Sequence, residues 1–226
     1  MAINLSRKRT LNSFFHDYRR EVMIGFCAFL ALIASLIFPK TFYGDSFWLS
    51  FFFLFLFPIL SVKFLLKEPL SDFGFSKGDS KWGLVFSATF IVLFVFLNYY
   101  IVSRPELRNQ LSIAPWIAKS FWSFILFQAF ITLPLHFFWD FFFRGFLQLG
   151  LESKLGKYSF FLQAILQSLL FFKGTWLMIF LVFISALAAG AIVRWSRSIF
   201  YSSVSMWIIS ASLDIMLIRL IRQGII

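Results

Sequence analysis

Cysteine and histidine are scarce in this sequence. One cysteine, Cys27, and two histidines, His16 and His136, occur among its 226 residues. A disulfide-built scaffold is excluded because it needs paired cysteines. A zinc site needs three or four ligands from His, Cys, Asp or Glu at suitable spacing, and the sequence offers no such set. Because a serine-protease triad and a phosphate-binding glycine loop are also missing, we expect no metal and no cofactor.

Charged residues are scarce too, at 14% of the chain, whereas 60% of the residues are hydrophobic. About a quarter of the residues of a soluble domain are charged, so this composition excludes an ordinary soluble protein and a disordered one. Several long runs are almost free of charge, and about 20 apolar residues in a helix span a bilayer core of roughly 30 Å. The sequence therefore predicts an integral membrane protein.

The apolar runs predict an all-α, polytopic transmembrane helix bundle. We expect about seven spans, with six or eight also compatible with the pattern. Pro134 divides the fourth run into two helical pieces, because proline interrupts an α-helix, and Pro58 predicts a kink in the second. The bundle is one domain, 22–226, preceded by a basic segment, 1–21. The runs are 22–38, 47–66, 82–102, 121–151, 158–172, 176–193 and 198–220.

The net charge of +11 comes from basic residues that cluster between the apolar runs. No nucleic-acid-binding motif accompanies them, so we expect no nucleic-acid partner and interpret them as orientation signals and contacts with anionic membrane lipids. A cytoplasmic N-terminus places thirteen basic residues on its own side and seven on the other, which the positive-inside rule favours. We expect a multi-pass protein of a cell membrane, in the first instance a bacterial inner membrane.

Three ionisable residues lie deep within the apolar runs: Asp140, Arg144 and Asp214. Such residues are costly in hydrocarbon and usually face the bundle interior, paired with each other or with a ligand. His136 precedes Asp140 by four residues and Arg144 follows it by four, so all three lie on one stripe of a helix. The stripe predicts an ion pair between Asp140 and Arg144, kept dry by neighbouring phenylalanines. It fits a structural pair as well as a functional site.

Asp214 lies in the last run, with Ser210 one turn before it. A lone aspartate within a membrane should be protonated or paired, and Arg144 is the candidate partner. If Asp140 and Asp214 share Arg144, the last helix must pack against the helix that follows Pro134. We therefore expect Asp214 and Ser210 to form a polar cluster with a binding or structural role.

Four segments resemble motifs of the CPBP family, the CaaX protease and bacteriocin-processing membrane proteins. WDFFFRGFLQ resembles the first motif, in which two adjacent glutamates are followed three residues later by Arg-Gly. LQAILQSLLFF resembles the second motif region and WSRSIFYSSVSMWIISASLD the third, while SDFGFSKGDSKWG resembles the loop that often precedes the core. The resemblance covers Leu70 to the C-terminus, with the core at about 117–220. It implies an intramembrane endopeptidase in which a glutamate activates water, and histidines and an asparagine stabilise the oxyanion.

The first motif of the family is altered in this chain. The position of the first glutamate, which acts as the general base in family members, is Trp139. The second glutamate corresponds to Asp140, a shorter carboxylate, and the arginine is present as Arg144.

The second and third motifs are altered as well. The histidine of the second motif falls at Phe171 or at Thr175, depending on the register. The histidine and asparagine of the third motif fall at Met206 and Ser210. Asp214 matches an acidic position of some members whose first glutamate is also replaced by an aromatic residue.

These replacements predict a degenerate member, a pseudoprotease that binds or scaffolds a membrane protein or a lipidated peptide. Tryptophan and methionine cannot accept a proton, and phenylalanine cannot donate to an oxyanion. Loss of one oxyanion donor typically lowers the rate by about a hundredfold or more. Two alternatives stay open. One is an active intramembrane protease that processes prenylated or membrane peptides through Asp140 and His136, with Arg144. The other is a small transporter built on the buried charges.

Overall fold

The computed structural model describes residues 18–38, 45–108, 111, 113–171 and 175–224. Every regular element in this part of the chain is helical, so the protein is the all-α, polytopic helix bundle that the sequence predicts. Six of the described helices are long and apolar enough to cross a membrane. They are Arg19–Ile37, Ser46–Leu66, Ser80–Ser103, Phe121–Leu155, Trp176–Ser196 and Ile199–Arg222.

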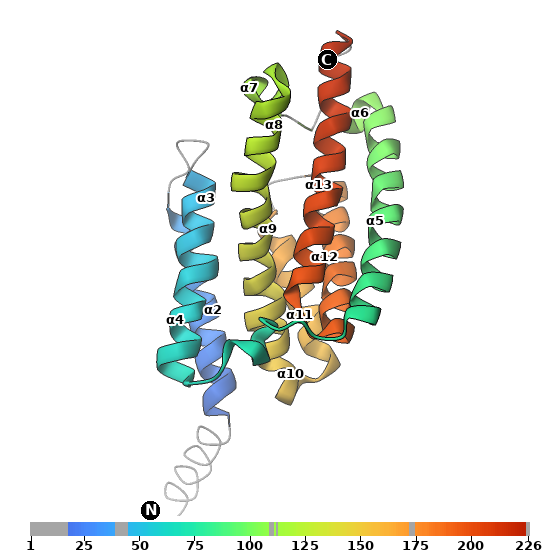
Figure 1. Ribbon diagram of the computed structural model, residues 1–226. Helices are drawn as coiled ribbons and strands as arrows, with labels where there is room; N and C mark the ends of the chain where they lie inside the picture. Colours follow the sequence, from blue (N-terminus) through green and yellow to red (C-terminus); the bar gives the residue numbers. More distant parts are fainter. Residues whose placement is uncertain (1–17, 39–44, 109–110, 112, 172–174, 225–226) are drawn as a thin grey trace, which may run out of the picture.

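A shorter helix, α11 (Lys157–Leu169), lies between the fourth and the fifth of these helices in the chain, and the seven are called passes below, in chain order. The first and last described residues lie at opposite ends of the bundle (Figure 1). With 13 residues, α11 reaches about 20 Å at 1.5 Å per residue, less than the thickness of a bilayer core. Six described helices, rather than the expected seven, are therefore long enough to cross, a number that the sequence pattern also allows, and the run 158–172 corresponds to the short helix α11.

Two of the passes, the second and the fourth, alternate between α-helical and π-helical segments. The first pass is α2 (Arg19–Ile37). The second joins α3 (Asp45–Leu49), η1 (Ser50–Leu56), α4 (Phe57–Leu60) and η2 (Ser61–Leu66). The fourth joins α8 (Phe121–Phe127), η4 (Gln128–Thr132), α9 (Leu133–Asp140), η5 (Phe141–Leu149) and α10 (Gly150–Leu155). The remaining elements are η3 (Leu70–Phe73), α5 (Ser80–Ser103), α6 (Pro105–Arg108), α7 (Pro115–Lys119), α12 (Trp176–Ser196) and α13 (Ile199–Arg222).

The prediction that Pro134 divides the fourth run is wrong. The fourth pass is one continuous helix of 35 residues, Phe121–Leu155. Pro134 lies in the first turn of α9, directly after the π-helical segment η4. A π-helical turn shifts the hydrogen-bond pattern by one residue, so the missing N–H of proline is absorbed without ending the helix. Pro58 has the same setting, between η1 and η2.

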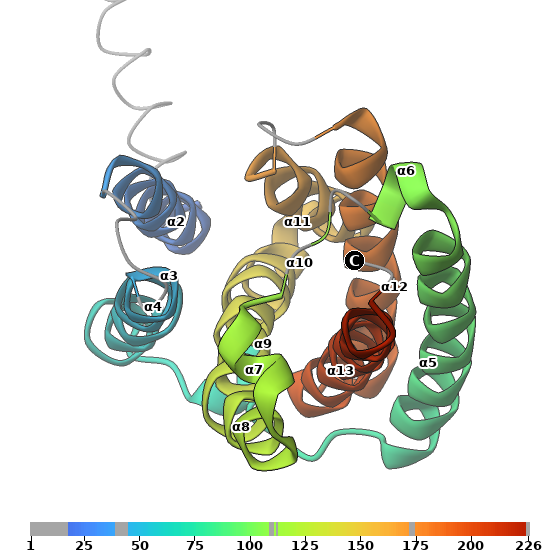
Figure 2. The same ribbon diagram turned by 90° about the horizontal axis from the view of Figure 1, so that it is seen from above.

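The last helix packs against the fourth pass, the arrangement expected if Asp140 and Asp214 shared Arg144. Seen from above (Figure 2), α13 lies between α9 and α5, and contacts join it to both. The fourth pass also contacts α11 on one side and the pair formed by α2 and η1 on the other. Its phenylalanines fill the core, since Phe141, Phe142, Phe143 and Phe146 are all fully buried. The fourth pass therefore stands at the centre of the bundle.

One end of the bundle is held together by polar contacts. Arg20 donates from Nε to Glu68 Oε1 over 2.7 Å and from Nη1 to the carbonyl of Gly150 over 2.5 Å. Arg197 forms an ion pair with Glu152. The contacts of Arg20 join the start of the first pass to the ends of the second and the fourth, and the ion pair of Arg197 joins the end of α12 to the fourth, at the lower end in Figure 1. Arg20 and Arg197 thus lie at the same end of the bundle.

The loop that crosses this end fixes the start of the last helix. Gly74 has φ +86°, a conformation that side chains disfavour, and its carbonyl accepts from Ile199 N over 3.1 Å. Ser198 is the N-cap residue of α13 and accepts from Phe200 N. The register of α13 is therefore set at its first turn, directly before Ser202 and Ser203.

Candidate functional site

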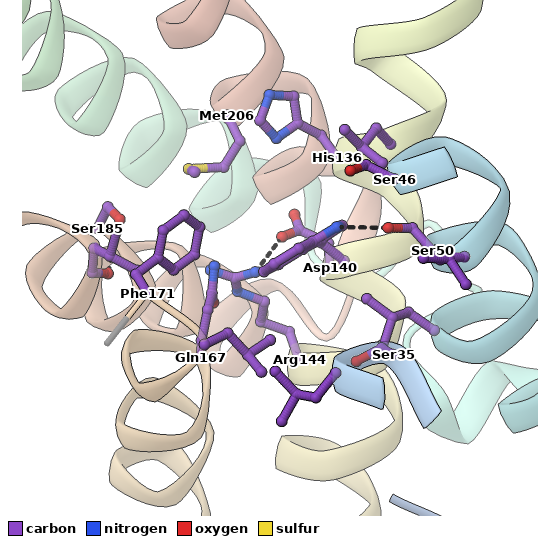
Figure 3. A pocket seen from close by; sticks show the side chains of 17 residues that line it. Ser35, Ser46, Ser50, His136, Asp140, Arg144, Gln167, Phe171, Ser185 and Met206 are labelled. Atoms are coloured by element: carbon purple, nitrogen blue, oxygen red, sulfur yellow. Dashed lines mark hydrogen bonds and ion pairs between the residues drawn. The ribbon is translucent and has the colours of Figure 1, made fainter. Parts of the chain in front are cut away.

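A cavity of about 410 Å³ lies within the bundle, between the first two passes and the last four. Its wall includes His136, Asp140 and Arg144 from the fourth pass, Gln167 from α11 and Met206 from α13 (Figure 3). The three residues of the predicted stripe thus line the same space. The size is that of a pocket for one small ligand or one chain.

The ion pair between Asp140 and Arg144 is confirmed. Arg144 Nη1 donates to Asp140 Oδ1 over 2.5 Å, and each residue is 1% exposed. Asp140 Oδ2 accepts from the hydroxyls of Ser202, over 2.6 Å, and Ser203, over 3.1 Å. A carboxylate has about four acceptor positions, so three donors fill most of them. Asp140 is built to hold Arg144 and to join the fourth pass to α13.

The two serines that bind Asp140, Ser202 and Ser203, are residues of the candidate site that the sequence reasoning missed. Both hydroxyls also lie within hydrogen-bond distance of Ile199 O, at 3.0 and 2.9 Å, so each proton is shared. Serine hydroxyls in helices commonly bond to a carbonyl of the preceding turn, and this habit does not reveal a second partner on another helix. The signal that the sequence does contain is the adjacent pair Ser202 and Ser203, one turn after the start of a predicted membrane helix.

Arg144 keeps hydrogen-bonding capacity that no described residue fills. Its Nε and Nη2 atoms are buried and have no partner within the described part of the chain. The same holds for Oε1 of Gln167, which also lines the cavity and is 5% exposed. A buried donor or acceptor without a partner costs about 1–3 kcal/mol, and more where it is charged. The cavity therefore favours an occupant that brings polar groups to this wall.

The rest of the wall is largely aromatic and aliphatic. Trp139 donates from Nε1 to Ser50 Oγ over 3.2 Å, which occupies the only polar atom of its side chain. The ring centroids of Trp139 and Phe171 lie 5.9 Å apart, and both residues line the cavity. Thr175 is the position of the second-motif histidine in the alternative register. It is the N-cap residue of α12 and accepts from Met178 N over 3.4 Å.

His136 lies in the upper part of the cavity in Figure 3, beside the labelled side chains of Met206 and Ser46. The histidine is half-buried, and no hydrogen bond or ion pair joins it to the described residues. The carboxylate of Asp140 is taken up by Arg144 and the serines rather than by the imidazole. His16 lies outside the described residues.

The predicted pairing of Asp214 with Arg144 is wrong. Asp214 Oδ2 accepts from Gln128 Nε2 over 2.7 Å, and neither Asp214 nor Ser210 lines the cavity. Asp214 follows Ser203 by 11 residues on α13, which places it about 17 Å further along the helix axis than the serine that binds Asp140. The offset is too large for one guanidinium to reach both carboxyl groups. Gln128 is the partner that sequence reasoning missed.

The fold and the cavity together define a multi-pass helical membrane protein with a buried ion pair beside an internal pocket. Within the described residues, no group of three or more His, Cys, Asp or Glu side chains is placed to bind a metal ion. Comparison of the chain with protein-family models, with curated proteins and with solved structures found no match.

Proposed function

We propose that this chain is a CPBP-like membrane protein that binds, rather than cleaves, a membrane protein or a lipidated peptide. One observation carries the proposal. Trp139, Phe171 and Met206 stand at positions that the resemblance gives to catalytic groups, and all three line one cavity with Asp140 and Arg144. They come from three passes that are far apart in the sequence. Their convergence supports a common origin for the site and a changed use.

The chemistry of the cavity favours binding over hydrolysis. Activation of water needs a base within hydrogen-bond reach, and an oxyanion needs donors aimed at it. Trp139, Phe171 and Met206 supply neither group. Asp140 is engaged by three donors, so its carboxylate acts as a positioning group for Arg144. What remains is a pocket with one polar wall.

The same proposal includes an orientation in a cell membrane, taken in the first instance as a bacterial inner membrane. The end of the bundle that holds Arg20, Lys154 and Arg197 faces the cytoplasm, where an excess of basic residues and anionic lipid headgroups are found together. Single cysteines at Lys154 and at Arg104, in a Cys27→Ala background, test it with an impermeant thiol reagent in intact cells. Labelling of the Arg104→Cys variant alone is expected, and labelling of the Lys154→Cys variant alone contradicts the orientation.

A cleavage assay tests the proposed function. Protein purified into lipid nanodiscs is incubated with prenylated CaaX peptides and with transmembrane peptides, and products are measured by mass spectrometry. We expect no product above the level of empty nanodiscs. Cleavage that is lost in Asp140→Asn but kept in Asp214→Asn, a matched change outside the cavity, would overturn the proposal.

An active protease that uses Asp140 and His136 is the second candidate. It is favoured by the position of His136 in the cavity, where the imidazole has no partner among the described residues. If the same assay does give products, His136→Ala separates the two candidates. This variant abolishes cleavage if the imidazole takes part in it, and leaves binding by a non-cleaving protein nearly unchanged.

A further inference from the structure

The unpartnered polar atoms of the cavity point to a particular class of ligand. Arg144 Nη1 is committed to Asp140, which leaves Nε and Nη2, the two nitrogens on one edge of the planar guanidinium. This edge presents parallel N–H groups that suit an oxygen acceptor. Gln167 Oε1 adds an acceptor from α11. These three atoms are fully buried, so a ligand in the cavity reaches them only when the side chains that cover them move. The wall then offers donors for a carbonyl oxygen and an acceptor for an N–H group.

The charge of the wall favours an uncharged ligand. Asp140 already balances the charge of Arg144, so a second anion would leave an excess negative charge in a site screened from water. A carbonyl oxygen needs no counter-charge. The hydroxyls of Ser35 and Ser185, which also line the cavity, donate to carbonyls of their own helices over 2.8 Å each. An amide group fits this wall because it carries both a carbonyl oxygen and an N–H.

The volume restricts what can carry the amide. A helix is about 10–12 Å wide with its side chains, so a space of about 410 Å³ holds roughly one turn and no transmembrane helix. An extended polypeptide brings an amide about every 3.3 Å, and each one buried without a partner is unfavourable in a membrane. The unpartnered buried atoms of Arg144 and Gln167 are enough to bind the carbonyl oxygen and the N–H of one amide. Apolar side chains such as Leu36, Leu49 and Leu135 line the remaining wall.

We propose that the cavity binds one uncharged amide carried on a single apolar chain. The carbonyl oxygen accepts from Nε and Nη2 of Arg144, and the amide N–H donates to Gln167 Oε1. The inference rests on the proposed function, because it names the ligand of the same cavity. An acyl amide lipid and the acyl junction of a lipidated peptide both present this chemistry.

A competition experiment tests the ligand class. A dodecanamide with a diazirine in its chain is photo-crosslinked to the protein in nanodiscs, and the labelled residues are found by mass spectrometry. Unlabelled competitors share the same chain length: N-methyldodecanamide, methyl dodecanoate, dodecanoate and dodecane. We expect the amide to compete best, and the ester, which lacks an N–H, to need about a tenfold higher concentration. Dodecanoate and dodecane should compete least.

Variants assign the recognition to residues. Gln167→Leu should remove the advantage of the amide over the ester, and Arg144→Lys, which keeps the charge beside Asp140, should weaken both by about tenfold or more. Gln128→Leu, a change at a buried glutamine outside the cavity, should leave the order of competitors unchanged. Size-exclusion profiles and melting curves of each variant separate loss of binding from loss of folding.

The outcomes separate this inference from the proposed function. Equal competition by dodecane, best competition by dodecanoate, or an amide advantage that survives Gln167→Leu would overturn the inference while the cavity remains a binding site. A hydrophobic dodecapeptide that competes better than N-methyldodecanamide would assign the cavity to polypeptide instead. Lipidated amides extended by a short peptide distinguish the two sources of the amide. If none of the cavity residues is labelled, the inference is overturned, whereas the proposed function is tested separately by the cleavage assay.

Discussion

Two aspartates lie within the described membrane-spanning helices, and their surroundings differ. Asp140, on α9, is 1% exposed and accepts from one guanidinium and two hydroxyls. Asp214, on α13, is half-buried and accepts from the amide of Gln128. The first site binds a charge with charge-assisted hydrogen bonds, and the second offers one neutral donor. Asp140 lines the cavity of about 410 Å³, and Asp214 does not.

The difference shows that an ionisable residue in a membrane helix is not by itself a functional site. Asp140 binds Nη1 of Arg144 and leaves the Nε and Nη2 edge of the guanidinium without a described partner. Its bonds to Ser202 and Ser203 join the fourth pass to the last. At Asp214 the bond joins the same two passes, through η4 and α13, but its donor is a neutral amide rather than a cation. We therefore expect the first site to be sensitive to loss of charge and the second to tolerate it.

Removal of one partner of the ion pair should have the largest effect. Arg144→Met leaves Asp140 buried without its counter-charge, and breaking a buried pair in this way typically costs about 3–5 kcal/mol. We expect the variant to be recovered in low yield, with a melting temperature far below that of the parent in fluorescence-detected size exclusion. A melting temperature within a few degrees of the parent would show that the pair does not hold the bundle together.

The double variant Asp140→Leu with Arg144→Met should be less harmful than either single change. Replacing a buried ion pair by packed apolar residues of similar volume is often neutral or stabilising, because both desolvation penalties disappear. Melting curves of the parent, the two single variants and the double variant form a thermodynamic cycle. A double variant that is less stable than both single ones would contradict a coupled pair.

Loss of the closer hydroxyl should have an intermediate effect. Ser202→Ala removes the 2.6 Å bond to Asp140, and hydrogen bonds to charged groups contribute about 1.5–3 kcal/mol. Ser203→Ala removes a bond of 3.1 Å and should have a smaller effect. Thermal unfolding of both variants, with Ser205→Ala as the control, measures the difference. Ser205 bonds only to its own helix, at Tyr201 O.

The sequence predicted the first site far better than the second, for physical reasons. Residues four apart on one helix must be neighbours, so the pair Asp140 and Arg144 followed from spacing alone. The partner of Asp214 depends on how two passes are offset along their axes, and spacing within one helix contains no information on that offset. Gln128 and Asp214 are 86 residues apart in the chain. The helix-breaking rule for proline failed at Pro134 because a π-helical segment absorbs the change.

Removal of the charge at Asp214 should have the smallest effect, and it tests the comparison directly. In Asp214→Asn the new amide still offers an oxygen to Gln128 Nε2, so we expect a loss below about 1 kcal/mol. The same change at Asp140 places an amide against Arg144 and removes the counter-charge of a buried guanidinium, so it should resemble Arg144→Met in its effect. The two variants carry the same Asp→Asn substitution and differ only in where it is placed. If their melting temperatures fall by similar amounts, the distinction between a charged site and a neutral one is wrong.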